Sequence, residues 1–282
     1  MIADNNIFTV DLEDRIYTVD YHTDLKASTI NQIKSTLINN TNEILRILRS
    51  SDCTATFFVL GKLADDLPAL IKKIQDDGHE IACHGYDHKS LKLMNPNSFR
   101  IDLERASNAI YGACGTVPRG FRAPYFSISD SNLWTVDILK EMDFDYDSSV
   151  QPFGYHPDYG YSNSSANIYN FKNGLTEIPL SVSEFSKLRI PCSGGAYFRF
   201  YPYKLFSHLF RTSFKQNNHS IFYIHPWELS KSDYLEPDSR LSTFRKYYNT
   251  ENTISKLEKF AVEFQFVSIS QFLNKITEKY VN

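Results

Sequence analysis

Several features that mark common protein classes are scarce or missing in this 282-residue sequence. Its four cysteines, Cys53, Cys83, Cys114 and Cys192, include no C-x-x-C pair, which argues against a structural zinc knuckle. We therefore expect four free, buried thiols in a reducing compartment. No G-x-G-x-x-G follows the first apolar run, residues 7–10, which argues against a dinucleotide-binding sheet.

An excess of charge, a leader and a long apolar run are also missing. The 30 basic and 33 acidic residues give a net charge of −3, so neither nucleic acid nor an anionic membrane is expected as a partner. No apolar stretch approaches the roughly 20 residues of a membrane span, so no span is expected. The residues before 7 lack a basic segment followed by a long apolar one, so we expect no signal peptide and a cytoplasmic location.

The chain does contain a regular alternation of apolar strands and amphipathic helices. Strands are expected at residues 7–10, 54–60, 79–83, 120–121, 144–149, 177–178, 188–190, 220–224 and 265–268. Helices are expected at residues 28–50, 67–77, 95–111, 130–142, 203–216, 252–264 and 269–280, with residues 39–41 as a candidate break in the first. This alternation favours a parallel sheet with helices outside, in a single α/β domain over residues 1–282. About seven βα units favour barrel-like closure, with the site at the carboxyl ends of the strands.

Four polar clusters follow apolar runs at those expected strand ends. They are Asp11–Asp14, His84–His88, Arg122–Tyr125 and His225–Glu228. Two histidines four residues apart can close on one cation, although such a pair alone would be incidental about half of the time. The other three clusters give the pair of His84 and His88 its weight.

The residue types in these clusters suit metal-assisted hydrolysis. Asp14 or Glu13 with His84 and His88 makes a two-histidine, one-carboxylate face, which zinc accepts with an open position for water. Fe²⁺, Mn²⁺, Co²⁺ and Ni²⁺ accept similar ligands. The expected cofactor is therefore a divalent metal, with Zn²⁺ the first choice.

The remaining polar residues suit acid and base roles. Asp11 is well placed to be the base rather than a ligand, and Arg122 is a candidate partner that would keep it ionised. His225, on a distant strand, suits a general acid near neutral pH, and Glu228 would support it or cap the next segment. Each residue alone also has a structural interpretation, as part of a solvated loop, as an ion-pair partner or as a core histidine.

Residues 150–174 lack periodicity but are rich in aromatic side chains. Long irregular segments in compact domains are often functional, so we expect this one to line a substrate site, with an ordered surface loop as the alternative. The aromatic fraction of 15% fits either a large aromatic core or ring faces that stack on sugars. The expected substrate contacts are Tyr125, Tyr155, His156 and Trp227.

As an ordered set, these clusters resemble the polysaccharide deacetylase family, the NodB-type carbohydrate esterase family 4. The five motifs that carry the resemblance are Thr9–Asp14, His84–His88, Arg122–Tyr125, Asp145–Ser149 and Ile224–His225. Their spellings look like one branch, which is associated with exopolysaccharide and O-antigen synthesis. That branch is also suggested by Gly-Gly-x-Tyr-Phe-Arg at residues 194–199 and His-Pro-Trp-Glu at residues 225–228.

The resemblance implies a distorted (β/α)7 barrel, a divalent metal, often zinc, and removal of N- or O-acetyl groups from sugars. Carried over by position, the resemblance implies that Asp11 is the base and that Arg122 orients it. It implies that Glu13 or Asp14 binds the metal together with His84 and His88. It also implies that Tyr125 is the oxyanion N–H donor and that His225 is the acid. The first motif departs from the usual adjacent aspartates because Leu12 follows Asp11. The carboxylate ligand therefore stays open between Glu13 and Asp14.

The leading hypothesis is a metal-dependent sugar N-deacetylase in cell-surface polysaccharide or O-antigen synthesis. Its substrate would be an acetylated sugar that is nucleotide-linked, lipid-linked or part of an oligosaccharide. A second hypothesis is a related amide or imide hydrolase, or a deformylase, acting on a small substrate. A third is a non-catalytic carbohydrate-binding protein that uses the aromatic segment 150–174.

Overall fold

A computed structural model describes residues 6–17, 26–153, 164–186, 188–230 and 248–281 of the chain. Within them, one sheet has the strand order β10-β1-β2-β3-β4-β5-β7-β6. Every neighbouring pair is parallel except β6 and β7, so seven strands run in one direction, which confirms the expected α/β topology. The strands are β1 (Asn6–Leu12), β2 (Thr56–Val59), β3 (Glu80–Cys83), β4 (Gly120–Phe121), β5 (Tyr146–Asp147), β6 (Tyr169–Asn170), β7 (Thr176–Glu177) and β10 (Ser220–Ile224).

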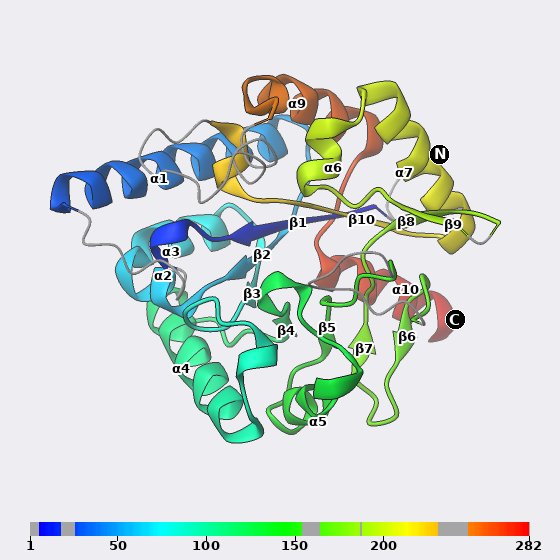
Figure 1. Cartoon of the computed structure of the whole chain (residues 1–282). Helices are drawn as coiled ribbons and strands as arrows, with labels where there is room; N and C mark the ends of the chain where they lie inside the picture. Colours follow the sequence, from blue (N-terminus) through cyan, green and yellow to red (C-terminus); the bar gives the residue numbers. More distant parts are fainter. Residues whose placement is uncertain (1–5, 18–25, 154–163, 187, 231–247, 282) are drawn as a thin grey trace.

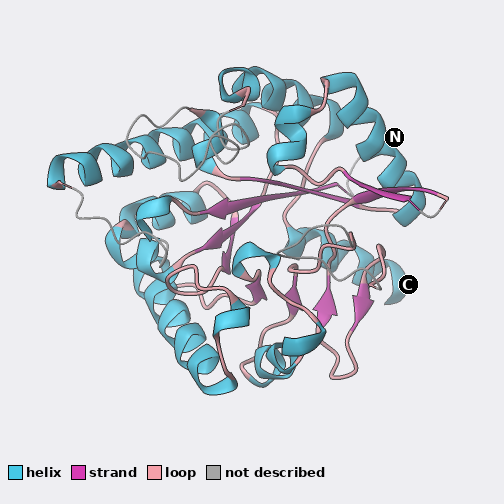
Figure 2. Ribbon diagram, viewed as in Figure 1, coloured by secondary structure: helices cyan, strands magenta, loops and turns pink. Residues whose placement is uncertain are grey.

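The sheet curls, and helices cover its outer side (Figure 1). The helices are α1 (Ala27–Ser50), α2 (Gly61–Asp66), α3 (Pro68–Asp76), α4 (Pro96–Cys114), α5 (Trp134–Glu141), α6 (Gly195–Phe200), α7 (Tyr203–Asn217), α9 (Thr253–Phe264) and α10 (Ile269–Val281). Single 3-10 turns include η1 (Arg15–Tyr17), η3 (Pro124–Phe126) and η5 (Pro226–Leu229). Figure 2 shows these helices around the strands of a single domain. Among the described helices, none combines the length and the apolar composition needed to cross a bilayer.

The sheet is a curled half-barrel rather than a closed one. Its order begins at β10 and ends at β6, and no pairing joins these two edges among the described residues. A separate antiparallel hairpin, β8 (Val182–Phe185) with β9 (Leu188–Pro191), lies outside this order. The expected seven parallel strands are therefore present, but the parallel ladder stops short of a full circle.

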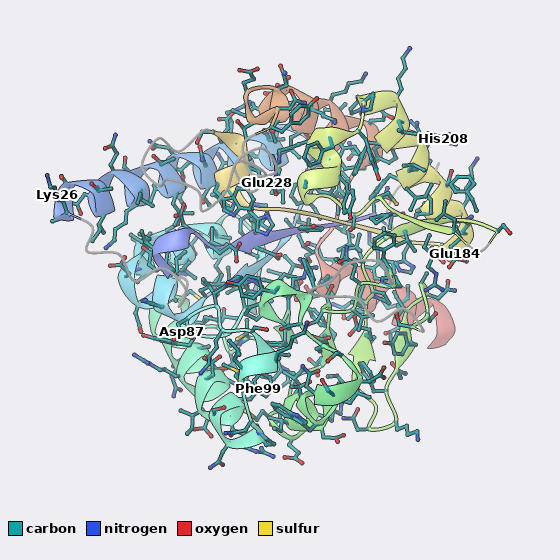
Figure 3. The ribbon with its side chains drawn as sticks, in the orientation of Figure 1. Lys26, Asp87, Phe99, Glu184, His208 and Glu228 are labelled. Atoms are coloured by element: carbon teal, nitrogen blue, oxygen red, sulfur yellow. The ribbon has the colours of Figure 1, made fainter. Side chains whose placement is uncertain are left out.

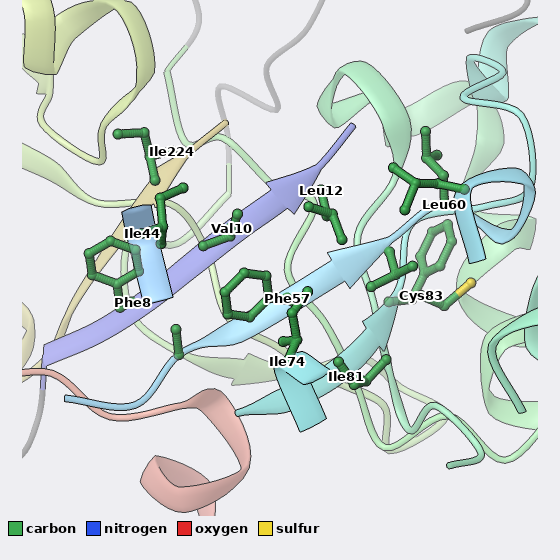
Figure 4. Close-up of a cluster of buried hydrophobic side chains, with 14 of the residues drawn as sticks. Phe8, Val10, Leu12, Ile44, Phe57, Leu60, Ile74, Ile81, Cys83 and Ile224 are labelled. Atoms are coloured by element: carbon green, nitrogen blue, oxygen red, sulfur yellow. The ribbon is translucent and has the colours of Figure 1, made fainter. Parts of the chain in front are cut away.

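Side-chain alternation along the strands divides the core into two clusters. Phe8, Val10 and Leu12 of β1 pack toward the helices, against Ile44 of α1 and Ile74 of α3 (Figure 4). The alternate positions belong to a second cluster on the concave side, with Ile7, Phe58, Ala82, Ile221 and Tyr223 among its members. Because successive residues of a strand point to opposite faces, Asp11 and His225 follow the concave series. The same pleat that buries the outer core thus directs the polar strand ends inward.

Several elements differ from the sequence-based expectations. Helix α1 runs through residues 39–41 without a break, because the buried Thr41 hydroxyl donates to the Leu37 carbonyl at 2.8 Å, within the helix. Helix α2 and strand β8 were not expected, and the strand expected at residues 265–268 is reduced to one bridge between Val267 and Ile7.

Candidate metal and catalytic site

Glu13, His84 and His88 come together at the carboxyl ends of β1 and β3. The Glu13 Oε2 atom lies 2.5 Å from His88 Nε2 and 3.6 Å from His84 Nε2. One ligand atom from each residue lies within 4.8 Å of the others, and all three residues are buried. Gly85 and His88 take positive φ angles of 75° and 60°, which turn the loop tightly enough to bring both imidazoles to one point.

The atoms in this cluster fit a divalent cation. His88 Nδ1 is buried without a hydrogen-bond partner among the described residues, and the buried Glu13 Oε2 faces the Nε2 atoms of both imidazoles. His84 Nδ1 lies 2.8 Å from the Arg122 carbonyl, which places its proton on Nδ1 and leaves Nε2 free to coordinate. Burial raises the pKa of Glu13, but the charge of His88 and the hydrogen bonds from both imidazoles outweigh burial and hold it well below its usual range. An ionised carboxylate between two imidazoles is a ligand set that Zn²⁺ and similar ions accept.

Of the two carboxylates left open by the sequence, Glu13 lies in this cluster and Asp14 lies outside it. Strand alternation gives the reason, because Asp11 and Glu13 point to one face and the side chain between or after them points to the other. A hydrogen bond from Glu13 N to Asp11 O at 3.0 Å tightens the chain here and keeps both carboxylates over the concave side.

Asp11 is held by Arg122 from across the sheet. Arg122 Nη1 lies 2.7 Å from Asp11 Oδ1, and the two residues are 0% and 1% exposed. The guanidinium also donates to the Thr9 hydroxyl at 2.8 Å and to the carbonyl and hydroxyl of Ser148 at 2.9 Å each. Its plane lies over the Phe58 ring, 4.1 Å from the centroid. These contacts fix the guanidinium, which in turn fixes the Asp11 rotamer.

His225 faces the same carboxylates from β10. Its Nε2 atom lies 3.5 Å from Glu13 Oε1 and 3.8 Å from Asp11 Oδ2. On its other side, Nδ1 lies 2.8 Å from Glu228 Oε1, so the Nδ1 proton is directed to Glu228 and Nε2 to the site. Burial lowers the pKa of His225, but the Glu228 hydrogen bond and the charges of Glu13, Glu228 and Asp11 raise it to about 9.

Glu228 is itself held by a residue whose role the sequence did not reveal. It is 0% exposed where η5 packs on α1, and Figure 3 labels it on the ribbon. Its second oxygen accepts from Arg199 Nε at 2.7 Å, and Arg199 is also buried. Glu228 both supports His225 and caps the next turn, since it accepts from the His225 backbone N–H at 3.1 Å. The signal for Arg199 was the spelling at residues 194–199, which carried no expected function.

Aromatic rings surround this polar centre. Tyr125, with a φ of 58° and 39% exposure, places its ring edge against His88 at 4.4 Å between centroids. Trp227 stacks on His225 at 4.8 Å, and its Nε1 lies 3.5 Å from Glu13 Oε1. Two of the four expected substrate contacts, Tyr125 and Trp227, thus lie beside the site. The other two, Tyr155 and His156, lie outside the described residues.

Two family models together match most of the chain. Residues 26–146 match the polysaccharide deacetylase model, and residues 148–274 match a domain of unknown function, DUF3473. A chitooligosaccharide deacetylase of Bradyrhizobium sp. (strain ANU 289) is 36% identical over 100 residues, which are 35% of this chain and 43% of that protein. A peptidoglycan-N-acetylglucosamine deacetylase of Bacillus cereus is 32% identical over 98 residues, or 34% and 36% of the two chains. The matches thus span less than half of these relatives.

Solved structures share the fold over nearly the whole chain. A putative polysaccharide deacetylase from Mycobacterium smegmatis has a TM-score of 0.65 and 22% identity, and the match covers 98% of this chain and 90% of that one. A CE4 family pseudoenzyme from Bacillus anthracis has a TM-score of 0.51 and 15% identity, with 96% and 66% covered. Since a pseudoenzyme shares the fold, activity has to be argued from the site residues. Residues 26–146 therefore belong to the polysaccharide deacetylase family, and the chain as a whole has the NodB-type fold shared with carbohydrate esterase family 4 structures.

Proposed function

We propose that this protein is a metal-dependent N-deacetylase that hydrolyses an N-acetyl group of a sugar. The observation that supports this most is the meeting of Glu13, His84 and His88 with Asp11 and His225 in one place. The ends of three strands, β1, β3 and β10, supply these residues, and the buried, hydrogen-bonded partners of Asp11 and His225 hold both in place. Such a constellation has one role for each step of amide hydrolysis.

In the proposed reaction, the residues of this chain divide the proton transfers. A divalent ion bound at Glu13, His84 and His88 would supply Lewis-acid polarisation of the acetyl carbonyl. Asp11, oriented by Arg122, accepts the proton of the attacking water. His225 donates its Nε2 proton to the leaving sugar nitrogen, and the amine and acetate depart. Glu228 accepts from Nδ1 throughout and so directs the Nε2 proton into the site.

We propose that the oxyanion is met by the Tyr125 backbone N–H and that Tyr125 and Trp227 contact the sugar. Their rings lie on either side of the centre, against His88 and His225, and such faces suit the C–H faces of a pyranose. Zn²⁺ is the proposed ion, with Co²⁺, Mn²⁺, Ni²⁺ and Fe²⁺ as alternatives. The proposed setting is cell-surface polysaccharide or O-antigen synthesis, with a nucleotide-linked, lipid-linked or oligosaccharide substrate. A cytoplasmic location stays a prediction.

The test is acetate release from a panel of acetylated sugars by metal-loaded protein. The panel contains N-acetylglucosamine oligosaccharides, peptidoglycan fragments and UDP-N-acetylglucosamine. We expect acetate from at least one substrate, with a loss of at least about a hundredfold in Asp11→Asn and His225→Ala. His208→Ala, on the exposed face of α7, is the matched control and should keep full activity.

Other outcomes would replace this function with a different one. Release of formate, or opening of a cyclic amide, without acetate would indicate the related amide hydrolase. Sugar binding that survives Asp11→Asn, without turnover of any substrate by the wild type, would indicate a carbohydrate-binding protein. Full acetate release by metal-free protein would contradict the proposed metal dependence.

A further inference from the structure

Two buried acids, Asp147 and Glu177, lie side by side behind the site. They are register partners on the neighbouring strands β5 and β7, and both are 0% exposed. The adjacent residues Tyr146 and Ile178 belong to the concave cluster, so alternation places the two carboxyls on the opposite, helix-facing side of the sheet. The pair therefore does not line the metal site, and nothing in the proposed reaction uses it.

The two carboxyls lie on one face of paired strands and act on each other's ionisation, so a proton on one of them relieves their repulsion. Burial raises the pKa of Glu177 well above its usual range, and the charge of Asp147 adds to the effect. Glu177 Oε2 is buried and accepts no hydrogen bond, as expected for an oxygen that carries the shared proton. Arg122 is the cation that acts electrostatically on both acids, but its guanidinium is bonded to Asp11 on the other face.

The pair grips the chain segment that follows β5. Asp147 accepts from the Ser149 hydroxyl at 2.5 Å and from the Ser149 backbone N–H at 3.2 Å. Glu177 Oε1 accepts from the Val150 backbone N–H at 2.9 Å. The two carboxyls thus accept three hydrogen bonds, which fix Ser149 and Val150.

That segment in turn holds the arm of the site at the end of β4. The Ser149 hydroxyl accepts from the Ala123 backbone N–H at 2.7 Å, and Ser148 accepts two hydrogen bonds from Arg122. Ala123 leads directly into Pro124 and Tyr125. Hydrogen bonds therefore run from Asp147 through Ser149 to Ala123, next to the Arg122 that holds Asp11, and Glu177 holds the adjacent Val150.

We propose that Asp147 and Glu177 form a positioning pair that holds one proton between them and fixes the Arg122–Tyr125 arm for catalysis. This inference rests on the proposed deacetylase function. With the proton present, Asp147 and Glu177 carry one negative charge between them and accept all three hydrogen bonds. Without it, two adjacent carboxylates in an apolar layer repel each other and the segment shifts.

Substitutions at Glu177 separate this positioning role from simple packing. Glu177→Gln keeps the Val150 contact and replaces the shared O–H by an amide N–H, so we expect kcat within about threefold of wild type. Glu177→Ala removes both and should lower kcat at least about tenfold, with a smaller change in KM, because the arm carries Arg122 and the Tyr125 N–H to the reacting groups but only one of the two proposed sugar contacts. Asp145→Asn, which alters only the exposed pair with Arg119, is the control and should leave both constants unchanged.

Infrared spectroscopy reads the proton without reference to activity. In protein with isotope-labelled glutamate, the wild type should show a protonated carboxyl band at neutral pH that is absent from Glu177→Gln. Absence of that band in the wild type would overturn the inference, and so would a Gln variant as impaired as the Ala variant. If the wild type shows the band but releases acetate from no substrate, the deacetylase proposal fails while the shared proton stands. If Glu177→Ala does not fold, the Gln variant and the band still decide.

Discussion

At the scale of single residues, His225 shows how neighbours set the chemistry of a side chain. Glu228 accepts a hydrogen bond from Nδ1 of His225, Glu13 and Asp11 lie near Nε2, and Trp227 stacks on one ring face. Burial alone would favour the neutral imidazole, yet three carboxylates favour the imidazolium and raise the pKa to about 9. A proton donor aimed at the site is the result.

Removing the Glu228 charge should therefore narrow the pH range of activity. Glu228→Gln keeps an oxygen near Nδ1 but lowers the pKa of His225, so the acid form is lost at a lower pH. We expect the alkaline limb of the kcat–pH profile to move to lower pH, with the acid limb unchanged. Glu263→Gln, at the exposed pair with Arg211, is the control. An alkaline limb that stays in place would show that His225 is not the acid.

At the scale of elements, the positions of strand ends followed from the sequence, whereas contacts across the fold did not. The apolar runs before Asp11, His84, Arg122 and His225 predicted buried strands, and parallel strands end at one edge. The choice of Glu13 over Asp14 depended on the pleat at the end of β1, which composition does not reveal. Contacts between residues far apart in the chain were harder still to predict from the sequence.

Arg199 and the hairpin of β8 and β9 illustrate what sequence patterns miss. Arg199 finds Glu228 only because α6 packs beside η5, and no local period marks that contact. Strand β8 has two successive polar residues, Ser183 and Glu184, and ends on the exposed Phe185, so its alternation of apolar and polar residues is weak. In contrast, two adjacent glycines in the sequence, Gly194 and Gly195, mark a tight backbone crossing against β10. A Cβ on Gly194 would lie 2.0 Å from the Tyr223 carbonyl oxygen.

Two glycines make a matched test of this crossing. Gly194 has a φ of 133° and no room for a methyl group, so Gly194→Ala should destabilise the fold by at least about 3 kcal/mol. Gly112 lies within α4 with nothing within 4 Å of an added Cβ, so Gly112→Ala should stabilise by up to about 1 kcal/mol. Urea unfolding measures both. Equal effects of the two substitutions would contradict the close approach of α6 to β10.

At the scale of the whole molecule, the site draws on both matched segments and on the strand before them. His84, His88 and Arg122 come from residues 26–146, and His225 comes from residues 148–274. Asp11 and Glu13 lie on β1, ahead of both matches, and β1 pairs with β10 on one side and β2 on the other. The His225 side of the centre therefore depends on the segment that matches a domain of unknown function.

Metal titration of the wild type and two variants tests the central claim most directly. We expect metal-free wild type to bind one Zn²⁺ per chain, Glu13→Gln to bind at least about tenfold more weakly, and Asp14→Asn to bind like the wild type. No binding by the wild type, or an equal loss in Asp14→Asn, would contradict a single cation held by Glu13, His84 and His88.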